Sequence, residues 1–473
     1  MFDLRTAYQW VPLAVMIGRG DTWFSGVSTD TRSVKPGDLF VALKGDRFDG
    51  HQFIDEAMAA GAAGVLVDQW PKRRDIPMLV VPSARKALGQ LAEAWRARFD
   101  LPVIAVTGSN GKTTVKEMIA SVLAAHFGPD GALVTEGNLN NDIGVPLTIL
   151  RLRAHHQAAV IELGMNHPGE IAVLTRIAQP TIGLVLNAQR EHQEFMDGPE
   201  ATARENGAVL QGMAKQGIAI FPGDDPCNEL WYRMKADRFS LEFGLCDSFD
   251  TTLHMVCALA SAHPSGFEAR IAENRFNIRL NIAGRHNVRN ALAALVCTWV
   301  LPVSPATIEA GLAAFRPVAG RLCREQQANG LVLIDDTYNA NPDSMRAAVD
   351  VLTDEAGPRL IVMGDMGETG AQAGAFHREV GQYAREQGIE MIWAVGQDMK
   401  VAAEAAGDKA RHWASVEDLL AEHPTPPPGV ASILVKGSRF MRMERIVRAW
   451  SDTSGQPSTA PHGAKPSSDA GDA

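Results

Sequence analysis

Short, mostly apolar runs recur along the chain and predict buried strands separated by helical segments. The runs lie at 38–43, 64–67, 77–81, 103–106, 158–161, 182–186, 217–221, 331–334, 359–363, 391–395 and 432–435. Residues 53–63 and 83–99 carry apolar side chains at the spacing of a helix face. Strands that alternate with helices indicate parallel sheets covered by helices. The pattern therefore predicts an α/β fold.

The length of 473 residues suggests about three domains at about 150 residues each. We predict a small N-terminal α/β domain over 1–85, a central domain over 86–315 and a doubly wound C-terminal domain over 316–450. Residues 451–473 contain no large aliphatic or aromatic side chain. Such a segment cannot bury surface, so we predict that this tail is disordered.

Composition and charge argue against several classes of function. The net charge is −10 and no stripe of basic residues occurs, so we expect neither nucleic acid nor an anionic membrane as a partner. Five scattered cysteines lack C-x-x-C spacing, which favours a reducing cytosol over disulfides or zinc. The apolar run 10–17 is short and broken by Pro12, and we interpret it as core rather than a signal peptide. No run approaches a membrane span.

The most informative stretch combines a strand, a glycine-containing loop and a helix start. Val103–Val106 is followed by the loop Thr107–Gly111, and a helical pattern begins at Thr113. In this layout backbone N–H groups and the helix dipole bind phosphate. Lys112 would reach the terminal phosphates and the Thr113 hydroxyl would coordinate magnesium. Val106 replaces the first glycine of the usual motif, and the alternative is a chance Gly-Lys-Thr turn.

Polar residues follow several of the predicted central strands. Glu162 ends one run, and the loop Asn187–Glu194, which contains His192, follows another. Ligands of parallel sheets bind beyond the carboxyl ends of the strands, so Glu162 is a second acidic group for magnesium. His192 is a candidate metal or phosphate contact. An exposed strand end and a solvated histidine are the alternatives.

Other polar groups favour ligand binding less specifically. Ser28–Arg32 and Gly45–His51 join short N-terminal strands and suit an anionic ligand paired with Arg32. The loop 135–146 carries three asparagines and two glycines, although turn chemistry alone explains such a composition. Asn287 and Asn290 stand three residues apart on a predicted helix and suit a heterocycle edge such as adenine.

The C-terminal strands also run into polar motifs, and with these in place the chain resembles the Mur ligases. These are ATP-dependent amide-forming enzymes of peptidoglycan precursor synthesis. The resemblance spans about residues 20 to 450 and includes Thr107–Thr114, whose spacing is the family version, and Arg321. It implies a UDP-binding N-terminal domain, a central phosphate-loop ATPase domain and a Rossmann-like C-terminal domain.

Within the family, three motifs resemble the branch that adds D-alanyl-D-alanine to a UDP-N-acetylmuramoyl-tripeptide. They are Asp335–Pro342, Gly364–Glu368 with His377 after it, and Lys436–Arg439. The resemblance implies that ATP phosphorylates the tripeptide carboxylate and that the dipeptide amine attacks the acyl phosphate. It also implies a cytoplasmic monomer with ATP and magnesium as cofactors.

The resemblance assigns roles residue by residue. The catalytic residues are Lys112, Glu162 and His192, and the magnesium ligands are Thr113, Glu162 and His192. The ATP contacts are Thr107, Gly108, Ser109, Asn110, Gly111, Lys112, Thr113, Thr114, Asn287, Asn290, Arg321 and, at the ribose, Asp336. The substrate contacts are Ser28, Thr31, Arg32, His51, Asn138, Asn140, Asn141, Asn339, Asn341 and Lys436.

The sequence departs from the family at one important position. Many members carry a carbamylated lysine about fourteen residues after the central-loop histidine, and its charge organises a second magnesium ion. Asn206 stands at that position here, and Ala208 replaces a glutamate. Because Asn206 carries no charge, we expect Glu205, Glu191 or Glu194 to substitute, or the second metal to bind weakly.

Three rival interpretations remain at this stage. The tripeptide-forming Mur ligase carries a D-N-P-R motif that is absent here. Folylpolyglutamate synthase shares the phosphate loop but lacks a UDP-type N-terminal domain. A nucleotide-binding homologue that has lost catalysis would explain Asn206 and Ala208, although Lys112, Glu162 and His192 all remain.

Overall fold

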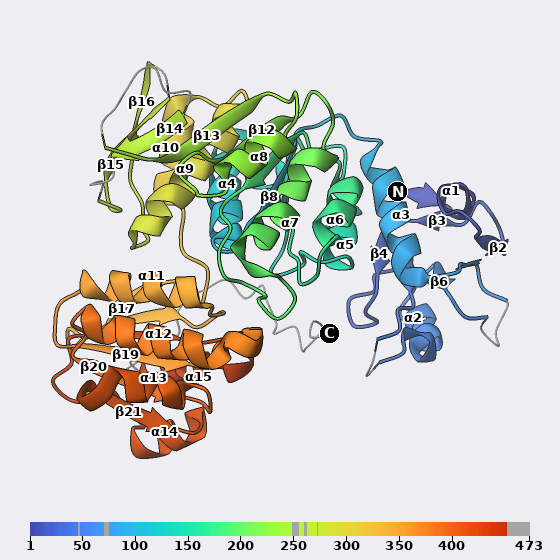
Figure 1. The fold of residues 1–473 in the computed structure, drawn as a ribbon. Helices are drawn as coiled ribbons and strands as arrows, with labels where there is room; N and C mark the ends of the chain where they lie inside the picture. The colour runs from blue at the N-terminus through green and yellow to red at the C-terminus, as the bar shows by residue number, and fades with distance from the viewer. Residues whose placement is uncertain (46–47, 71–74, 248–254, 260–262, 272, 452–473) are drawn as a thin grey trace. The chain divides into compact units, whose positions relative to one another are not determined.

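The α/β fold class predicted from the sequence is confirmed in a computed structural model (Figure 1). The structure describes residues 1–45, 48–70, 75–247, 255–259, 263–271 and 273–451. The predicted tail, apart from Ser451, lies outside these residues. The chain divides between Ala87 and Leu88 into two compact units. None of the described helices combines the length and apolar character that a membrane crossing requires.

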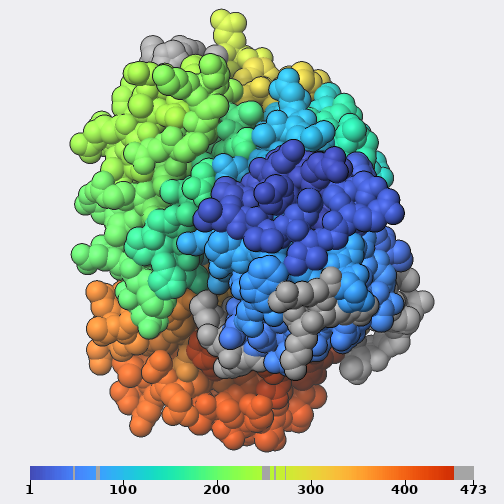
Figure 2. All heavy atoms as spheres, turned by 90° about the vertical axis from the view of Figure 1, so that its right-hand side faces the viewer, coloured from blue at the N-terminus to red at the C-terminus, as the bar shows by residue number. Residues whose placement is uncertain are grey.

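The first unit, drawn in blue in Figure 2, is built on a five-stranded sheet. The strand order is β2 (Val15–Ile17), β7 (Met78–Val80), β6 (Gly64–Val67), β5 (Asp38–Val41) and β4 (Gly26–Ser28). Only β2 runs antiparallel to its neighbour. The apolar side chains of β5, β6 and β7 pack against α2 (Ile54–Ala59). A second, two-stranded sheet pairs β1 (Phe2–Asp3) with β3 (Trp23–Phe24).

Two expectations for this unit need correction. The helix expected over 53–63 is a 3-10 turn, Gly50–Phe53, followed by α2, and Gly61 has a φ of +104°, which ends the helical path. The apolar run 10–17 is not continuous core. Helix α1 (Leu4–Trp10) ends as the run begins, and Leu13 is 84% exposed.

The second unit contains a nine-stranded sheet. Its order is β16 (Asn274–Ile278), β15 (Phe267–Ile271), β14 (Met255–Leu259), β13 (Ser240–Cys246), β12 (Ile218–Pro222), β11 (Ile182–Val185), β8 (Val103–Thr107), β10 (Ala158–Glu162) and β9 (Ala132–Val134). The strands from β9 to β14 pair in parallel, so their carboxyl ends share one edge. Strands β9 and β13 to β16 were not predicted; β15, for example, alternates buried and half-buried residues instead of forming one apolar run.

Helices cover this sheet on both faces (Figure 1). The helices α4 and α9 pack with α10 against apolar strand side chains in one continuous core. Their bounds are Lys112–Phe127, Arg285–Trp299 and Pro305–Ala314. The other helices are α3 (Ala84–Arg96), which joins the two units, α5 (Gly144–Ile149), α6 (Glu170–Ala178), α7 (Gly198–Gly212) and α8 (Asn228–Met234).

A six-stranded sheet completes the second unit. Its order is β17 (Cys323–Gln326), β18 (Val332–Asp336), β22 (Ser432–Lys436), β19 (Arg359–Gly364), β20 (Met391–Val395) and β21 (Ala410–Trp413). Only β17 is antiparallel. The helices here are α11 (Pro342–Thr353), α12 (Ala373–Glu386), α13 (Met399–Ala406), α14 (Val416–Glu422) and α15 (Glu444–Trp450). The polar ends of β18, β19 and β22 lie at one edge.

Candidate active site

The phosphate loop depends on two glycines with left-handed backbone conformations. Gly108 has a φ of +139°, and a Cβ there would lie 2.8 Å from the Leu186 Cβ. Gly111 has a φ of +89° and caps the N-terminus of α4. A Cβ at Gly111 would lie 2.6 Å from the Asn290 Oδ1. Both positions therefore require glycine, and the loop presents backbone N–H groups at the start of a sixteen-residue helix.

The Lys112 ammonium lies against its own loop. Its Nζ donates to the carbonyl oxygens of Gly108 at 2.5 Å and Ser109 at 3.2 Å. It also lies 3.4 Å from the Glu191 Oε2. The side chain is 17% exposed, so the cation sits at the mouth of the loop, where an anionic ligand would meet it.

Glu162 is held in place by hydrogen bonds from three elements. Its Oε2 accepts from the Thr113 hydroxyl at 3.0 Å, and its Oε1 accepts from the Asn140 amide at 2.9 Å. Its backbone N–H donates to the Thr135 hydroxyl. The residue is 2% exposed. The structure thus brings together Thr113 and Glu162, the two residues predicted to hold the first magnesium.

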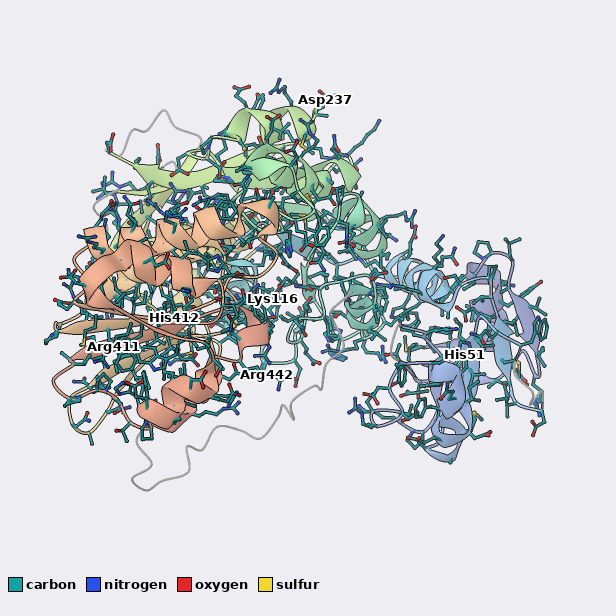
Figure 3. The ribbon with its side chains drawn as sticks, turned by 60° about the horizontal axis from the view of Figure 1, so that its bottom comes forward. His51, Lys116, Asp237, Arg411, His412 and Arg442 are labelled. Atoms are coloured by element: carbon teal, nitrogen blue, oxygen red, sulfur yellow. The ribbon has the colours of Figure 1, made fainter. Side chains whose placement is uncertain are left out.

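Lys116 is a buried cation beside Glu162 that sequence reasoning missed. Its Nζ donates to the Thr135 carbonyl at 2.7 Å and lies 2.9 Å from the Glu117 carboxylate and 3.9 Å from that of Glu162. The side chain is fully buried and is labelled in Figure 3. The available signal was its position four residues after Lys112, which places both lysines on one face of α4.

Arg321 reaches the phosphate loop from the C-terminal part of the second unit. Its Nη2 donates to the Thr113 hydroxyl at 2.9 Å, and its guanidinium lies 4.1 Å from the centre of the Tyr338 ring. The resemblance assigns Arg321 to adenine, whereas here it contacts the hydroxyl that is predicted to bind metal.

The loop 187–194 is tied to the phosphate loop by side-chain amides. The Asn187 Oδ1 accepts from the Asn110 backbone N–H at 2.9 Å, and its Nδ2 donates to the Asn110 carbonyl. The Gln189 Oε1 accepts from the Asn110 amide at 2.6 Å, and the Gln189 N–H donates to the Ser109 hydroxyl. Ser109 and Asn110 therefore fix this loop beside the phosphate loop.

His192 and Glu191 form a charged pair of neighbours in this loop. The His192 Nδ1 lies 2.6 Å from the Glu368 Oε2, and its Nε2 lies 3.9 Å from the Glu191 Oε2. Burial lowers the pKa of His192, but attraction by Glu368 and Glu191 outweighs burial, and the pKa is raised overall. The contact with His192 lowers the pKa of Glu368. Glu191 is 7% exposed, and its Oε1 is buried without a hydrogen-bond partner.

Asn206 stands at the position where the family resemblance implies a carbamylated lysine. It lies on α7, is 1% exposed, and its Oδ1 accepts a 2.5 Å hydrogen bond from the Thr107 hydroxyl. Its Nδ2 is buried without a partner. Glu205, beside it, accepts hydrogen bonds from the Gly169 and Ile171 backbone N–H groups, both at 2.8 Å. Glu205 therefore caps α6 instead of facing the phosphate loop.

The two predicted adenine amides bond to each other. The Asn290 Nδ2 donates to the Asn287 Oδ1 at 2.8 Å, and the Asn287 Nδ2 donates to the Ala283 carbonyl. Asn287 is 1% exposed, so it orients Asn290, which faces Gly111 in the phosphate loop. Thr114, the last residue of the predicted loop, is buried at 7% exposure.

Asp336 and Lys436, which the resemblance assigns to different ligands, form an ion pair. The Lys436 Nζ lies 2.7 Å from the Asp336 Oδ2 and donates to the Asn339 carbonyl at 2.9 Å. Burial raises the pKa of Asp336, although Lys436 opposes that shift. The Asn339 side chain accepts from the next backbone N–H.

The four remaining predicted asparagines have different surroundings. Asn341 caps α11 and exchanges two hydrogen bonds with Asn110, at 3.1 and 3.3 Å. It therefore contacts the phosphate loop, whereas the resemblance suggested the muramyl-peptide side. Asn141 accepts from the Gly144 N–H at the start of α5. Asn138 is exposed and Asn140 contacts Glu162.

In the first unit, His51 lies between two aspartates. Its Nδ1 is 2.7 Å from the Asp49 Oδ1, and its Nε2 is 3.2 Å from the Asp68 Oδ1. The hydrogen bond to His51 lowers the pKa of Asp49. Residues 46 and 47 of the predicted loop 45–51 lie outside the described residues. Figure 3 labels His51 in this unit.

The other N-terminal candidates gather after β4. The Ser28 hydroxyl contacts that of Ser33 at 2.9 Å, and the Thr31 hydroxyl donates to Glu56. Arg32 pairs with Asp30 at 2.6 Å, which lowers the pKa of the Asp30 carboxyl. The Arg32 side chain is 70% exposed, so its charge is accessible to an anion.

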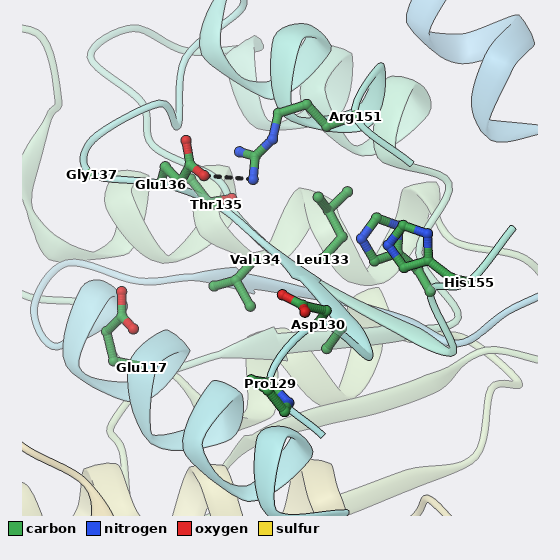
Figure 4. A pocket seen from close by; sticks show the side chains of 12 residues that line it. Glu117, Pro129, Asp130, Leu133, Val134, Thr135, Glu136, Gly137, Arg151 and His155 are labelled. Atoms are coloured by element: carbon green, nitrogen blue, oxygen red, sulfur yellow. Dashed lines mark ion pairs between the residues drawn. The ribbon is translucent and has the colours of Figure 1, made fainter. Parts of the chain in front are cut away.

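A hollow of about 920 Å³ lies along β9, the edge strand of the large sheet (Figure 4). Glu117, Asp130 and His155 line it, and an ion pair of 2.6 Å joins Arg151 to Glu136 across its rim. Thr135, Glu136 and Gly137, which begin the loop 135–146, also line the hollow. Among the described residues, no group of three or more His, Cys, Asp or Glu side chains is arranged to hold a metal ion.

A phosphate loop whose Lys112 and Thr113 meet the carboxylates of Glu191 and Glu162 is typical of a nucleotide-using α/β enzyme. Family models match at three places: "Mur ligase family, catalytic domain" at 24–96, "Mur ligase middle domain" at 106–298 and "Mur ligase, glutamate ligase domain" at 320–439. The chain belongs to the Mur ligase family.

Individual relatives agree over nearly the whole chain. The UDP-N-acetylmuramoyl-tripeptide–D-alanyl-D-alanine ligase of Escherichia coli is 40% identical and covers 91% of this chain and 94% of its own. A crystal structure of MurF from Acinetobacter baumannii matches with a TM-score of 0.85 at 35% identity, covering 94% and 98%. The MurF ligase of Thermotoga maritima in complex with ADP matches with a TM-score of 0.79 at 27% identity, covering 91% and 97%.

Proposed function

We propose that this protein joins D-alanyl-D-alanine to a UDP-N-acetylmuramoyl-tripeptide at the expense of ATP. The observation that carries the proposal is that the phosphate loop brings Lys112 beside Glu191 and Thr113 beside Glu162, and that His192 adjoins Glu191. The relatives that cover the chain almost entirely are named for this reaction. The free thiols of all five cysteines suit a reducing compartment, and we propose a cytoplasmic monomer.

The reaction proposed has two steps. The terminal carboxylate of the tripeptide takes the γ-phosphoryl group of ATP and becomes an acyl phosphate. The amine of D-alanyl-D-alanine then attacks the acyl carbon, and phosphate leaves as the amide forms. Lys112 neutralises charge on the moving phosphoryl group, and Arg321 brings a second cation to the same place. Positioning and charge neutralisation are the main tasks of a protein in such transfers.

Two cation positions follow from the residues present. Thr113 and Glu162 already share a 3.0 Å hydrogen bond, and both offer the oxygen ligands that magnesium prefers. We place the second position at His192 and Glu191, because Glu191 keeps a buried oxygen without a partner. A bound magnesium ion would supply charge neutralisation for the phosphates. Asn140 would orient Glu162 through the hydrogen bond that its amide donates to the Glu162 carboxylate.

Substrate contacts are proposed in both units. Arg32 offers an accessible cation for the diphosphate of UDP, and Ser28, Thr31 and His51 lie in the same unit. Asn138 and Asn339 are exposed polar groups on loops at the strand ends of the second unit. Asn290, Asp336 and Lys436 remain proposed contacts, with Asn287 as the residue that orients Asn290.

The test measures phosphate release with ATP, magnesium and the UDP-muramyl-tripeptide. We expect release when D-alanyl-D-alanine is added and none when single amino acids replace it. Release with a single amino acid and the UDP-muramyl-dipeptide would assign the neighbouring ligase instead. If ATP binds but no pairing releases phosphate, Asn206 marks a homologue that has lost catalysis.

A further inference from the structure

Arg190 is hydrogen-bonded to two carboxylates of the second unit, those of Asp343 and Glu379. It lies in the loop 187–194, directly before Glu191. Its backbone N–H donates to the Asp343 Oδ2 at 2.8 Å, and its Nη2 donates to the Asp343 Oδ1 at 2.7 Å. The same guanidinium donates to both carboxylate oxygens of Glu379, at 2.6 and 2.9 Å.

These contacts join two sheets of the unit. The loop follows β11 of the nine-stranded sheet. Asp343 lies in the first turn of α11 and Glu379 lies on α12, and these two helices pack on the six-stranded sheet. The Arg190 side chain is 24% exposed and also lies 5.3 Å from the centre of the Phe376 ring. Paired, partly buried guanidinium–carboxylate contacts are the strong and geometrically specific class of ion pair. The two carboxylates raise the pKa of Arg190, so the charge is permanent.

The neighbouring residues of the loop are those the reaction needs. Glu191 lies 3.4 Å from the Lys112 ammonium, and His192 lies 2.6 Å from Glu368, which follows β19 of the six-stranded sheet. The Glu194 N–H also donates to the Glu368 carbonyl at 3.2 Å. The loop 187–194 therefore contains Glu191, which contacts Lys112 of the phosphate loop, and also the residues that bind the elements of the six-stranded sheet.

We infer that Arg190 is a positioning residue that fastens this loop to α11 and α12 and thereby sets Glu191 and His192 against the phosphate loop. The inference rests on the proposed function, since the groups it positions serve that reaction. The phosphate-loop part of the ATP site is built on β8 and α4, and Arg190 makes none of its described contacts there. Loss of Arg190 should therefore reduce kcat more than it raises the KM for ATP.

The experiment compares Arg190→Ala with Arg346→Ala in the full chain. Arg346 also lies close to Glu379, at 3.2 Å, but it belongs to α11, so its pair stays beside the six-stranded sheet. We expect kcat to fall about 10- to 100-fold in Arg190→Ala, as for a lost alignment, and by less than about twofold in Arg346→Ala, as for an exposed pair. The double variant R190E/D343R keeps one cation between two carboxylates and should recover part of kcat.

A structural readout separates this inference from the function. Spin labels on encoded non-canonical residues at Glu229 and Lys400 report the distance between the sheets, because the two exposed residues lie on α8, which packs on the nine-stranded sheet, and on α13, which packs on the six-stranded sheet. We expect Arg190→Ala to broaden the distance distribution, and Arg346→Ala to leave it as in the parent protein. Equal distributions, or equal kcat values in the two variants, would overturn the inference. An inactive parent protein with a broadened Arg190→Ala distribution would overturn only the proposed function.

Discussion

Glu191 is the carboxylate best placed to replace the missing charge at Asn206. Of the three candidates, Glu205 accepts hydrogen bonds from backbone N–H groups at the start of α6, and Glu194 is exposed. Glu191 alone is buried beside Lys112 with an oxygen free of partners. Because Asn206 carries no charge, we propose that Glu191, on the loop that carries His192, supplies the anionic contribution instead.

We expect Glu191→Ala to raise the magnesium concentration needed for half-maximal activity by at least about tenfold, as for lost metal contacts. Glu194→Ala is the matched control, since it removes an exposed carboxylate three residues away. The measurement is the activity of both variants and of the parent protein as a function of magnesium concentration. Unchanged magnesium dependence in Glu191→Ala would show that this carboxylate does not serve the second cation.

The pair of His192 and Glu368 makes a pH-dependent contribution to stability. The pKa of His192 is raised above 6.5, so its contribution is present below about pH 6.5 and is lost as pH rises through the raised value. The pKa of Glu368 is lowered below 4.5, so its contribution is lost only as pH falls through that lowered value. The pair is therefore strongest between these limits.

The contribution of the His192–Glu368 pair is measured as the difference in the free energy of unfolding between the parent protein and Glu368→Gln, by urea unfolding between pH 5 and 8. We expect the parent to be the more stable near pH 5 to 6 and the difference to shrink toward pH 8. Glu368 is 41% exposed on its side chain, so the difference will be small. A difference that grows with pH would mean that His192 is neutral in this contact.

At the scale of elements, Glu205 shows how one side chain can stabilise a neighbouring helix. Its carboxylate accepts hydrogen bonds from the Gly169 and Ile171 N–H groups at the start of α6, where backbone donors have no partner within the helix. Glu205 is 9% exposed, so its removal leaves two donors without partners. We expect Glu205→Ala to lower the free energy of unfolding by about 2–3 kcal/mol.

The control for this prediction is Glu200→Ala on the same helix. Glu200 is exposed and pairs only with Arg204 among its described ion pairs, so a change within about 0.5 kcal/mol is expected. Urea unfolding measures both variants. If Glu205→Ala instead retains stability and changes the magnesium dependence, the side chain serves the metal and not the helix.

The sequence predicted most strands of the α/β fold that are apolar on both faces, although it missed Met255–Leu259. Val103–Thr107 was predicted and is buried throughout, and Arg359–Gly364 is buried from Leu360 onward. It missed Phe267–Ile271, where buried and half-buried residues alternate, and it extended the helix after Phe53 past Gly61. Periodicity records local burial, but it does not record which edge of a sheet a strand occupies.

Site residues followed the same logic. Thr113 and Glu162 could be paired because parallel strands place their carboxyl ends together. The contacts of Arg190 and Asn341 depend on which segments from distant parts of the chain meet, and no local spacing encodes that. Asn206 could be recognised as a departure, but its partner, Thr107, required the structure.

For the whole molecule, the division into two units predicts two separable unfolding events. Residues 1–87 have their own sheet and core around β5 and β6, and residues 88–450 carry the phosphate loop. A ligand that binds one folded unit stabilises it by about 2.7 kcal/mol at one hundred times its Kd. We expect a non-hydrolysable ATP analogue with magnesium to raise the melting temperature of the second unit only, and UDP that of the first only.

Differential scanning calorimetry of the full chain resolves the two transitions, with Lys112→Met as the matched variant. Because Lys112 lies at the mouth of the phosphate loop, that variant should lose most of the shift caused by the ATP analogue and keep the shift caused by UDP. A shift of both transitions by either ligand would mean that the two units unfold together. Loss of both shifts in Lys112→Met would mean that nucleotide binding in the second unit controls the first.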